Sequence, residues 1–185
     1  MTGTTERAAA GLWSAWRIAR WAAVLVLLLL PLVMMQVSDE WNWGILDFLF
    51  AGTMIGGTTL LYELAERTSG SRAYRAGAGL ALVTCLLTVW TTIVRDNGDG
   101  MIFFELVMAA VVGSFAAWFR PAGMSRTMIG VAVMQVLVGI AIATAPSAES
   151  FPGGAPRALL FNGFFALLWL TSAAFFRAAA RSDSA

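Results

Sequence analysis

The chain consists of long apolar runs separated by short polar connectors. An α-helix rises 1.5 Å per residue, so about twenty apolar residues are needed to cross ~30 Å of hydrocarbon. Runs of this length predict six membrane-spanning helices, near residues 19–37, 45–65, 75–94, 101–119, 127–145 and 158–176. Gly, Pro, Ser, Asp and Asn are concentrated in the connectors, none of which is long enough for a second domain. The pattern predicts an all-α polytopic membrane helix bundle, a single transmembrane domain over residues 1–185.

Arginine is distributed unevenly between the two sides that this topology defines. Ten arginines fall at the termini and in the second and fourth connectors, against two, Arg95 and Arg157, in the connectors of the other side. The positive-inside rule places the arginine-rich side in the cytoplasm. We therefore expect both termini to be cytoplasmic and the membrane to be a bacterial inner membrane, with the acidic connectors facing the periplasm.

The segment before the first apolar run, residues 1–18, is basic and aromatic. It contains Arg7, Trp13, Trp16 and Arg17, which predict an interfacial helix over residues 5–18, lying on the cytoplasmic leaflet. The run that follows is too long for an ordinary signal peptide and leads into MMQVSDE rather than a small-x-small cleavage site. The first run is therefore expected to be a retained span.

The amino-acid composition excludes several classes of cofactor and catalytic site. Apolar residues make up 59% of the chain and charged residues 12%, a balance that requires lipid as the solvent. The chain has no His, no Lys and a single Cys, Cys85, so the usual ligands of haem and chlorophyll, the Schiff-base amine and the Ser-His-Asp arrangement are all missing. A net charge of +1 does not indicate the basic surface that nucleic-acid binding requires. We expect no cofactor, no metal and no enzymatic activity.

Small residues predict where helices approach closely, because lipid tails are as apolar as Leu and membrane helices associate through backbone contact. In the second run Gly52 and Gly56 share one face with the carboxylate of Glu63. Small or polar residues also occupy the opposite face. This helix is therefore expected to be central. The carboxylate of Glu105 is aligned with Ala109 in the fourth run, so we expect it to face protein. Gly77 and Gly139 carry a weaker form of the same signal.

Two intramembrane carboxylates, Asp47 and Glu105, lie roughly one turn below the periplasmic surface. Placing an ionisable side chain at such depth costs free energy, so its presence indicates either a function or a compensating contact. One hypothesis is a polar periplasmic pocket that these two share with Arg95, Asn162 and Asn42, able to hold a proton or a cation. The alternative is that each carboxylate is partly hydrated or bonded locally and only fixes helix packing.

A second group of charges surrounds the second connector, on the cytoplasmic side. It consists of Glu63, Glu66, Arg67, Arg72 and Arg75. One interpretation is a set of ion pairs and snorkelling side chains that pin a short loop. The other is a docking patch for anionic lipid or a partner protein.

Three uncharged residues complete the candidates. Gln135 lies near the middle of the fifth run and Asn162 near the start of the sixth, where an amide usually bonds a neighbouring helix. Cys85 lies mid-span in apolar surroundings, which favours a small core residue over a nucleophile.

The segments WNWGILDFLFAG (41–52), LLYELAERTSGSRAYRAGAGLAL (60–82) and LLFNGFFALLWLTSAAFFRAAAR (159–181) resemble a family of small, uncharacterised multi-pass bacterial membrane proteins. The resemblance covers most of the spans. It implies a six-helix bundle in the inner membrane and no particular activity, cofactor or partner.

No nucleophile–base pair, metal cluster or phosphate-binding loop is visible in the sequence. We therefore expect a non-enzymatic accessory, assembly or structural component of the membrane, in contact with the lipid bilayer and with a partner membrane protein or further copies of itself. The alternative is a small permease or proton-coupled carrier in which Asp47 and Glu105 pick up and release a proton.

Overall fold

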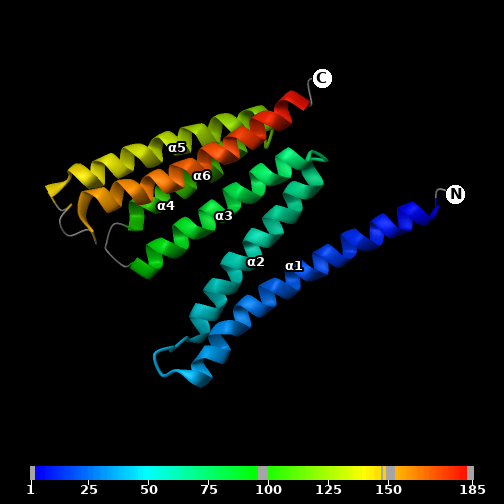
Figure 1. The fold of residues 1–185 in the computed structure, drawn as a ribbon, viewed down its shortest axis with the longest axis horizontal. Coiled ribbons are helices and arrows are strands. Elements are labelled where there is room, and N and C mark those ends of the chain that lie inside the picture. Colours follow the sequence, from blue (N-terminus) through cyan, green and yellow to red (C-terminus); the bar gives the residue numbers. More distant parts are fainter. Residues whose placement is uncertain (1–2, 96–99, 147, 149–152, 183–185) are drawn as a thin grey trace. The chain divides into compact units, whose positions relative to one another are not determined.

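The computed structural model describes residues 3–95, 100–146, 148 and 153–182, with side chains for residues 15–93 and from 101 onward within these ranges. The described chain is helical (Figure 1). Its elements are α1 (Gly3–Val37), α2 (Ile45–Thr68), α3 (Arg72–Arg95), α4 (Gly100–Ala116), α5 (Pro121–Thr144) and α6 (Gly154–Ser182).

Each predicted apolar run is a helix, so the all-α class is confirmed. Five helices, all except α4, are long and apolar enough to cross a membrane. The exception, α4, has 17 residues, which at 1.5 Å each give about 26 Å, slightly less than the ~30 Å of an average hydrocarbon core. Five of the six predicted spans thus have the length and apolarity that a membrane crossing requires.

The N-terminal segment differs from the prediction of a separate interfacial helix over residues 5–18. The backbone from Gly3 to Val37 is one continuous helix of 35 residues, α1. No Gly or Pro interrupts the sequence between Gly11 and Pro31, so nothing there ends the helix at the boundary between the basic segment and the apolar run. Trp13 and Arg7 lie outside the residues with described side chains.

The described chain forms two units, an N-terminal unit up to Leu61 and a C-terminal unit from Tyr62 onward. In the N-terminal unit α1 and the first part of α2 bury little surface. Among the residues of this unit with described side chains, Val24, Pro31 and Ala51 are buried. A Cβ built on Gly52 would lie 3.9 Å from Leu28 Cδ1, an ordinary van der Waals distance. Most apolar side chains of this unit are exposed, which suits helices whose solvent is lipid.

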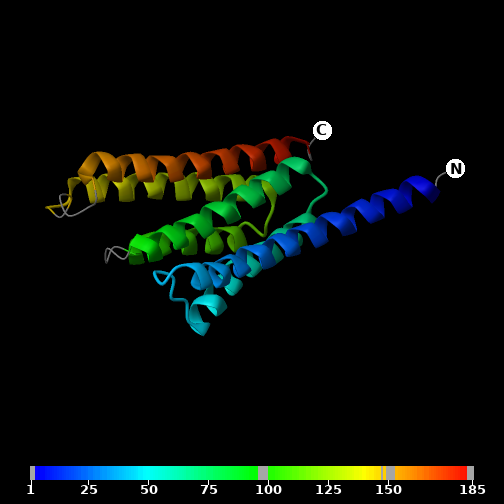
Figure 2. The ribbon, with the colours of Figure 1, turned by 60° about the horizontal axis from the view of Figure 1, so that its bottom comes forward.

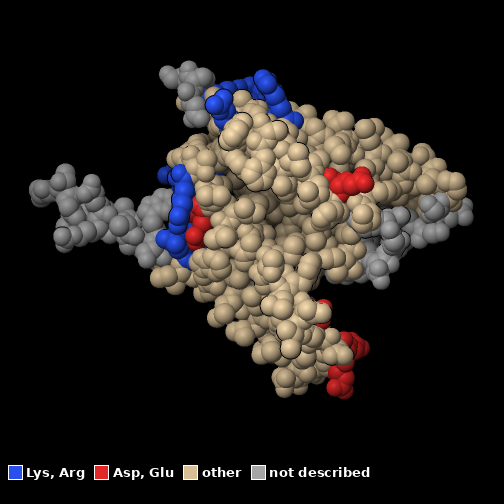
Figure 3. Space-filling model, turned by 180° about the vertical axis from the view of Figure 1, so that it is seen from behind, with Lys and Arg blue, Asp and Glu red and all other residues tan. Residues whose placement is uncertain are grey.

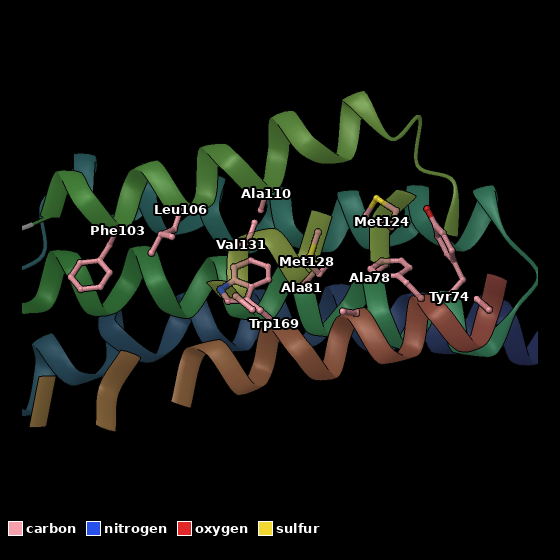
Figure 4. Packing of buried hydrophobic residues seen from close by; sticks show 14 of the residues in the cluster. Tyr74, Ala78, Ala81, Phe103, Leu106, Ala110, Met124, Met128, Val131 and Trp169 are labelled. Atoms are coloured by element: carbon pink, nitrogen blue, oxygen red, sulfur yellow. The ribbon is translucent and has the colours of Figure 1, made fainter. Parts of the chain in front are cut away.

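In the C-terminal unit α6 is the central helix, with its main contacts to α5 and α3. In both ribbon views α5 and α6 lie side by side along their length (Figures 1 and 2). The core of the unit includes Tyr74, Met128, Trp169 and Phe176, each at most 2% exposed (Figure 4). The Tyr74 and Phe176 rings meet edge to face, with centroids 5.1 Å apart.

Within the C-terminal unit α6 is the central helix. Most of α2 belongs to the other unit, so the expectation that the second span is central in the whole bundle stays a prediction. Small residues permit close approach, but they do not specify which helix approaches. A Cβ on Gly77 of α3 would lie 3.2 Å from Phe175 and Phe176 of α6. A Cβ on Gly139 of α5 would lie 2.6 Å from Asn162 of α6. The close approach that small residues predicted is thus found where α3 and α5 meet α6.

The turn from α4 to α5 has an unusual backbone. Helix α4 ends in a Schellman motif, in which the Phe119 N–H bonds the Ser114 carbonyl and the Trp118 N–H bonds the Phe115 carbonyl. Trp118 and Phe119 have φ angles of 50° and 55°, in the left-handed region that favours glycine. Pro121 then begins α5 at its first position, where the missing N–H is of no consequence.

Candidate functional sites

Asp47 serves the start of its own helix. It lies in the first turn of α2, and its carboxylate accepts a hydrogen bond of 2.8 Å from the Gly44 N–H. This is one half of a capping box, and the negative charge also lies favourably at the N-terminal end of the helix dipole. Asp47 and Asn42 are both exposed in the N-terminal unit. This hydrogen bond supports the alternative that Asp47 is bonded locally.

Glu105 is exposed on α4 in the C-terminal unit. Its neighbours in sequence, Phe103 and Leu106, turn the other way and are 7% and 1% exposed. The carboxylate therefore lies on the face of α4 that the core of this unit does not cover. The expectation that Glu105 faces protein is not met within the C-terminal unit.

Asn162 is buried in the contact between α5 and α6. Its side-chain oxygen accepts a 2.7 Å bond from Gln135 Nε2, and its Nδ2 donates a 2.9 Å bond to the Ala158 carbonyl one turn earlier. Asn162 is 1% and Gln135 0% exposed. The prediction that both amides bond a neighbouring helix is confirmed, and Gly139 makes room for them.

The candidate pocket residues are thus distributed over different surroundings. Within the C-terminal unit Asn162 is sealed in the bundle while Glu105 is exposed, so these two do not share a surface. Asp47 and Asn42 belong to the N-terminal unit, and the side chain of Arg95 lies outside the described residues. The shared pocket stays a prediction.

The group of charges around the loop between α2 and α3 includes Arg75, which holds this loop in place. Its Nε donates to the Ser69 carbonyl at 3.2 Å and its Nη2 to the Gly70 carbonyl at 3.3 Å. Both carbonyls belong to the loop between α2 and α3. Arg67 and Arg72 are exposed, which leaves them accessible to lipid or a partner.

The acidic members of this group differ in their surroundings. Glu63 is 7% exposed, while Glu66 is half-buried. Both take part in polar interactions of their own. Arg75 thus holds the loop through hydrogen bonds to backbone carbonyls, while ion pairs within this group and the docking patch both stay predictions.

Hydroxyl groups join helices at points that the sequence analysis did not single out. Each donates to a backbone carbonyl of a neighbouring segment, at distances between 2.8 and 3.1 Å: Ser172 to Gly77, Tyr74 to Phe119, Ser125 to Ala173 and Thr127 to Gly113. Two of the four acceptors are glycines, whose missing side chains expose the carbonyl. Serine or threonine opposite a glycine was the available signal, but the helix partners were not known.

Cys85 packs against the core of the C-terminal unit, as predicted for a small core residue. Within the described residues, no three or more His, Cys, Asp or Glu side chains come together as a group that could hold a metal ion.

Comparison with known protein families, with curated proteins and with solved structures finds no match for this chain. The resemblance to a family of small bacterial membrane proteins stays a prediction, and function has to be argued from the residues themselves.

Proposed function

We propose that the chain is an integral protein of a bacterial inner membrane, with six spans and both termini in the cytoplasm, that acts as a non-enzymatic accessory or assembly component. Five helices of sufficient length and apolarity support the membrane location. The alternation of arginine between connectors supports the orientation. On the face drawn in Figure 3 most of the described surface carries no charge, as a lipid or protein contact requires.

The observation that carries the proposal is the position of Glu105 on an otherwise apolar helix face. An ionisable side chain inside a membrane costs a few kcal/mol and almost always faces protein or a water-filled cavity. Glu105 is exposed in the C-terminal unit. It is surrounded on that face by exposed apolar side chains: Met101, Phe104, Met108, Val112 and Phe115. A polar group of a second membrane protein, or of a second copy of the chain, would offset the cost of the carboxylate.

Disulfide cross-linking tests this proposal directly. Cys85 is the only cysteine, so Cys85→Ala gives a background without thiols. In that background Met108→Cys places a thiol on the Glu105 face of α4, and Val133→Cys places one on an exposed part of α5. In native membranes we expect Met108→Cys to cross-link to a copy of the chain or to a co-purifying protein, and Val133→Cys not to do so.

The Glu105→Leu variant provides the chemical control. It keeps the face apolar and removes the carboxylate, so the cross-link at Met108→Cys should weaken if Glu105 is bonded across the interface. A chain that purifies at native expression as a clean monomer, with no cross-link from either position, contradicts the proposal.

A further inference from the structure

Two polar atoms buried in the C-terminal unit have no hydrogen-bond partner among the described residues. They are Gln135 Oε1 on α5 and Trp169 Nε1 on α6, and both residues are 0% exposed. The first is an acceptor and the second a donor. Buried polar atoms without partners are rare in native proteins, because each loses its bond to water on folding.

The geometry of the α5–α6 contact brings these atoms toward each other. The approach of Gly139 to Asn162 and the bond from Ser125 to Ala173 show that the helices run antiparallel, so Trp169 lies opposite the turn of α5 that precedes Gln135. Helical side chains lean toward the N-terminus of their own helix. For Trp169 this is the direction of Asn162, the partner of Gln135.

Figure 4 shows on which side of the indole ring the nitrogen of Trp169 lies. The nitrogen of Trp169 lies on the side of the ring that is nearer to Phe103. Helix α5 runs toward that end of the unit, from Met124 through Met128 to Val131. Gln135 is one turn further along α5, so the indole N–H and the free amide oxygen lie in the same part of the bundle.

Helix α3 adds polar groups at this level. The bond from Ser172 to Gly77 sets the register of α3 against α6, and two turns along from Gly77 lies Thr84, followed by Thr88. Both are buried, at 0% and 2% exposed. Their hydroxyl hydrogens are used within α3, but a hydroxyl oxygen can accept a further bond. A layer of neutral polar groups from three helices therefore crosses the unit, and the described residues buried in this layer include no carboxylate and no arginine.

We propose that this layer binds a water molecule that joins α5 to α6. The water accepts a hydrogen bond from Trp169 Nε1–H and donates one to Gln135 Oε1, so both orphaned atoms are satisfied at once. Buried waters typically bond to polar groups of this kind. Turning the Gln135 amide over does not help, because it would bring two oxygens together at Asn162. The neutral layer suits water rather than an ion.

Nuclear magnetic resonance of the full chain in lipid nanodiscs, with isotope-labelled tryptophan, tests the proposal. The eight indole N–H signals are recorded, and that of Trp169 is identified by its loss in Trp169→Phe. If this variant does not fold, Trp169 is identified as the signal that a water-soluble paramagnetic reagent leaves unbroadened, since its side chain is 0% exposed. We expect a cross-peak between the Trp169 indole proton and a long-lived water.

The bridge to Gln135 is tested with a matched pair of variants on α5. Gln135→Leu removes one partner of the water, and the cross-peak should disappear. Met134→Leu, next to it on the exposed side of the helix, should leave the cross-peak unchanged. A wild-type spectrum without a water cross-peak at Trp169, which a direct bond from Trp169 to Gln135 would also give, overturns the proposal. A cross-peak that survives in Gln135→Leu overturns the bridge.

Discussion

Gly139→Ala is the substitution for which the structure gives the clearest expectation. A Cβ at this position would lie 2.6 Å from Asn162 Cβ and 3.1 Å from Asn162 Cγ. Carbon atoms in contact are normally ~3.5–4.0 Å apart, so α6 has to retreat by about 1 Å at this point. The Gln135–Asn162 bond, now 2.7 Å long, would then stretch beyond the ~3.2 Å that an N–H···O bond tolerates.

The magnitude follows from three terms. Overpacking a well-packed contact costs about 1–3 kcal/mol, and losing an interhelical bond in a membrane protein costs about 0.6 kcal/mol on average and up to ~1.7. The better helix propensity of Ala over Gly returns about 1 kcal/mol. The free energy of unfolding should therefore fall by about 1–4 kcal/mol.

Gly130→Ala is the matched control, because Gly130 lies on the same helix and a Cβ there meets nothing within 4 Å. It gains the propensity term without the clash, so it should unfold at the same free energy as wild type or up to about 1 kcal/mol above it. Reversible unfolding by SDS in mixed detergent micelles, followed by circular dichroism, measures both variants. Equal stability of Gly139→Ala and Gly130→Ala would refute the reasoning.

A double-mutant cycle separates the clash from the lost bond. In a Gln135→Leu background the bond to Asn162 is already gone, so the effect of Gly139→Ala should shrink by about 0.6–1.7 kcal/mol. An unchanged effect would show that Gly139→Ala acts through the clash alone and leaves the Gln135–Asn162 bond intact.

Three further changes follow from single contacts. Ser172→Ala removes the hydroxyl that bonds the α3 carbonyl and should lower the unfolding free energy by about 0.6–1.7 kcal/mol in the same titration; Thr171→Val, whose hydroxyl bonds only its own helix, should change it by less than about 0.5. Trp118→Gly relieves a left-handed backbone and should raise the unfolding free energy by about 1 kcal/mol; a decrease would show that the exposed ring itself is needed. Arg75→Ala should speed protease cleavage of the loop between α2 and α3 in vesicles, and Arg72→Ala, exposed beside it, should not.

The positions of the helices could be predicted from the sequence because hydrocarbon thickness imposes a length on each apolar run. Helix α2 begins at Ile45, where the apolar run was expected to begin. The predicted ends of the helices were less accurate where a helix continues beyond its apolar run into a polar connector. Helix α5 begins at Pro121 and α6 continues to Ser182, since a helix does not have to end where the hydrocarbon ends and Arg177 and Arg181 are good helix formers.

The partners of each helix could not be predicted, because the signals for close approach are short and common. Gly77 and Gly139 carried the same weak signal, and both lie against α6, which neither spacing specified. The amides of Gln135 and Asn162 were correctly expected to bond across helices, since a buried amide has few other options. That they bond each other depended on the antiparallel register of α5 and α6, which no local pattern encodes.

The residues of the candidate site differ in whether the bundle can satisfy their polar groups. Neutral groups such as Asn162 can be satisfied inside the bundle wherever a glycine opens the way to a neighbour, whereas a carboxylate needs a charge, several donors or water. Asp47 meets this need at the N-terminus of its own helix. Glu105 lies within α4, beyond the free N–H groups of the first turn, and the core beneath α4 gives it no cover. It is therefore the carboxylate that requires something outside the C-terminal unit, and the place where a partner should be sought.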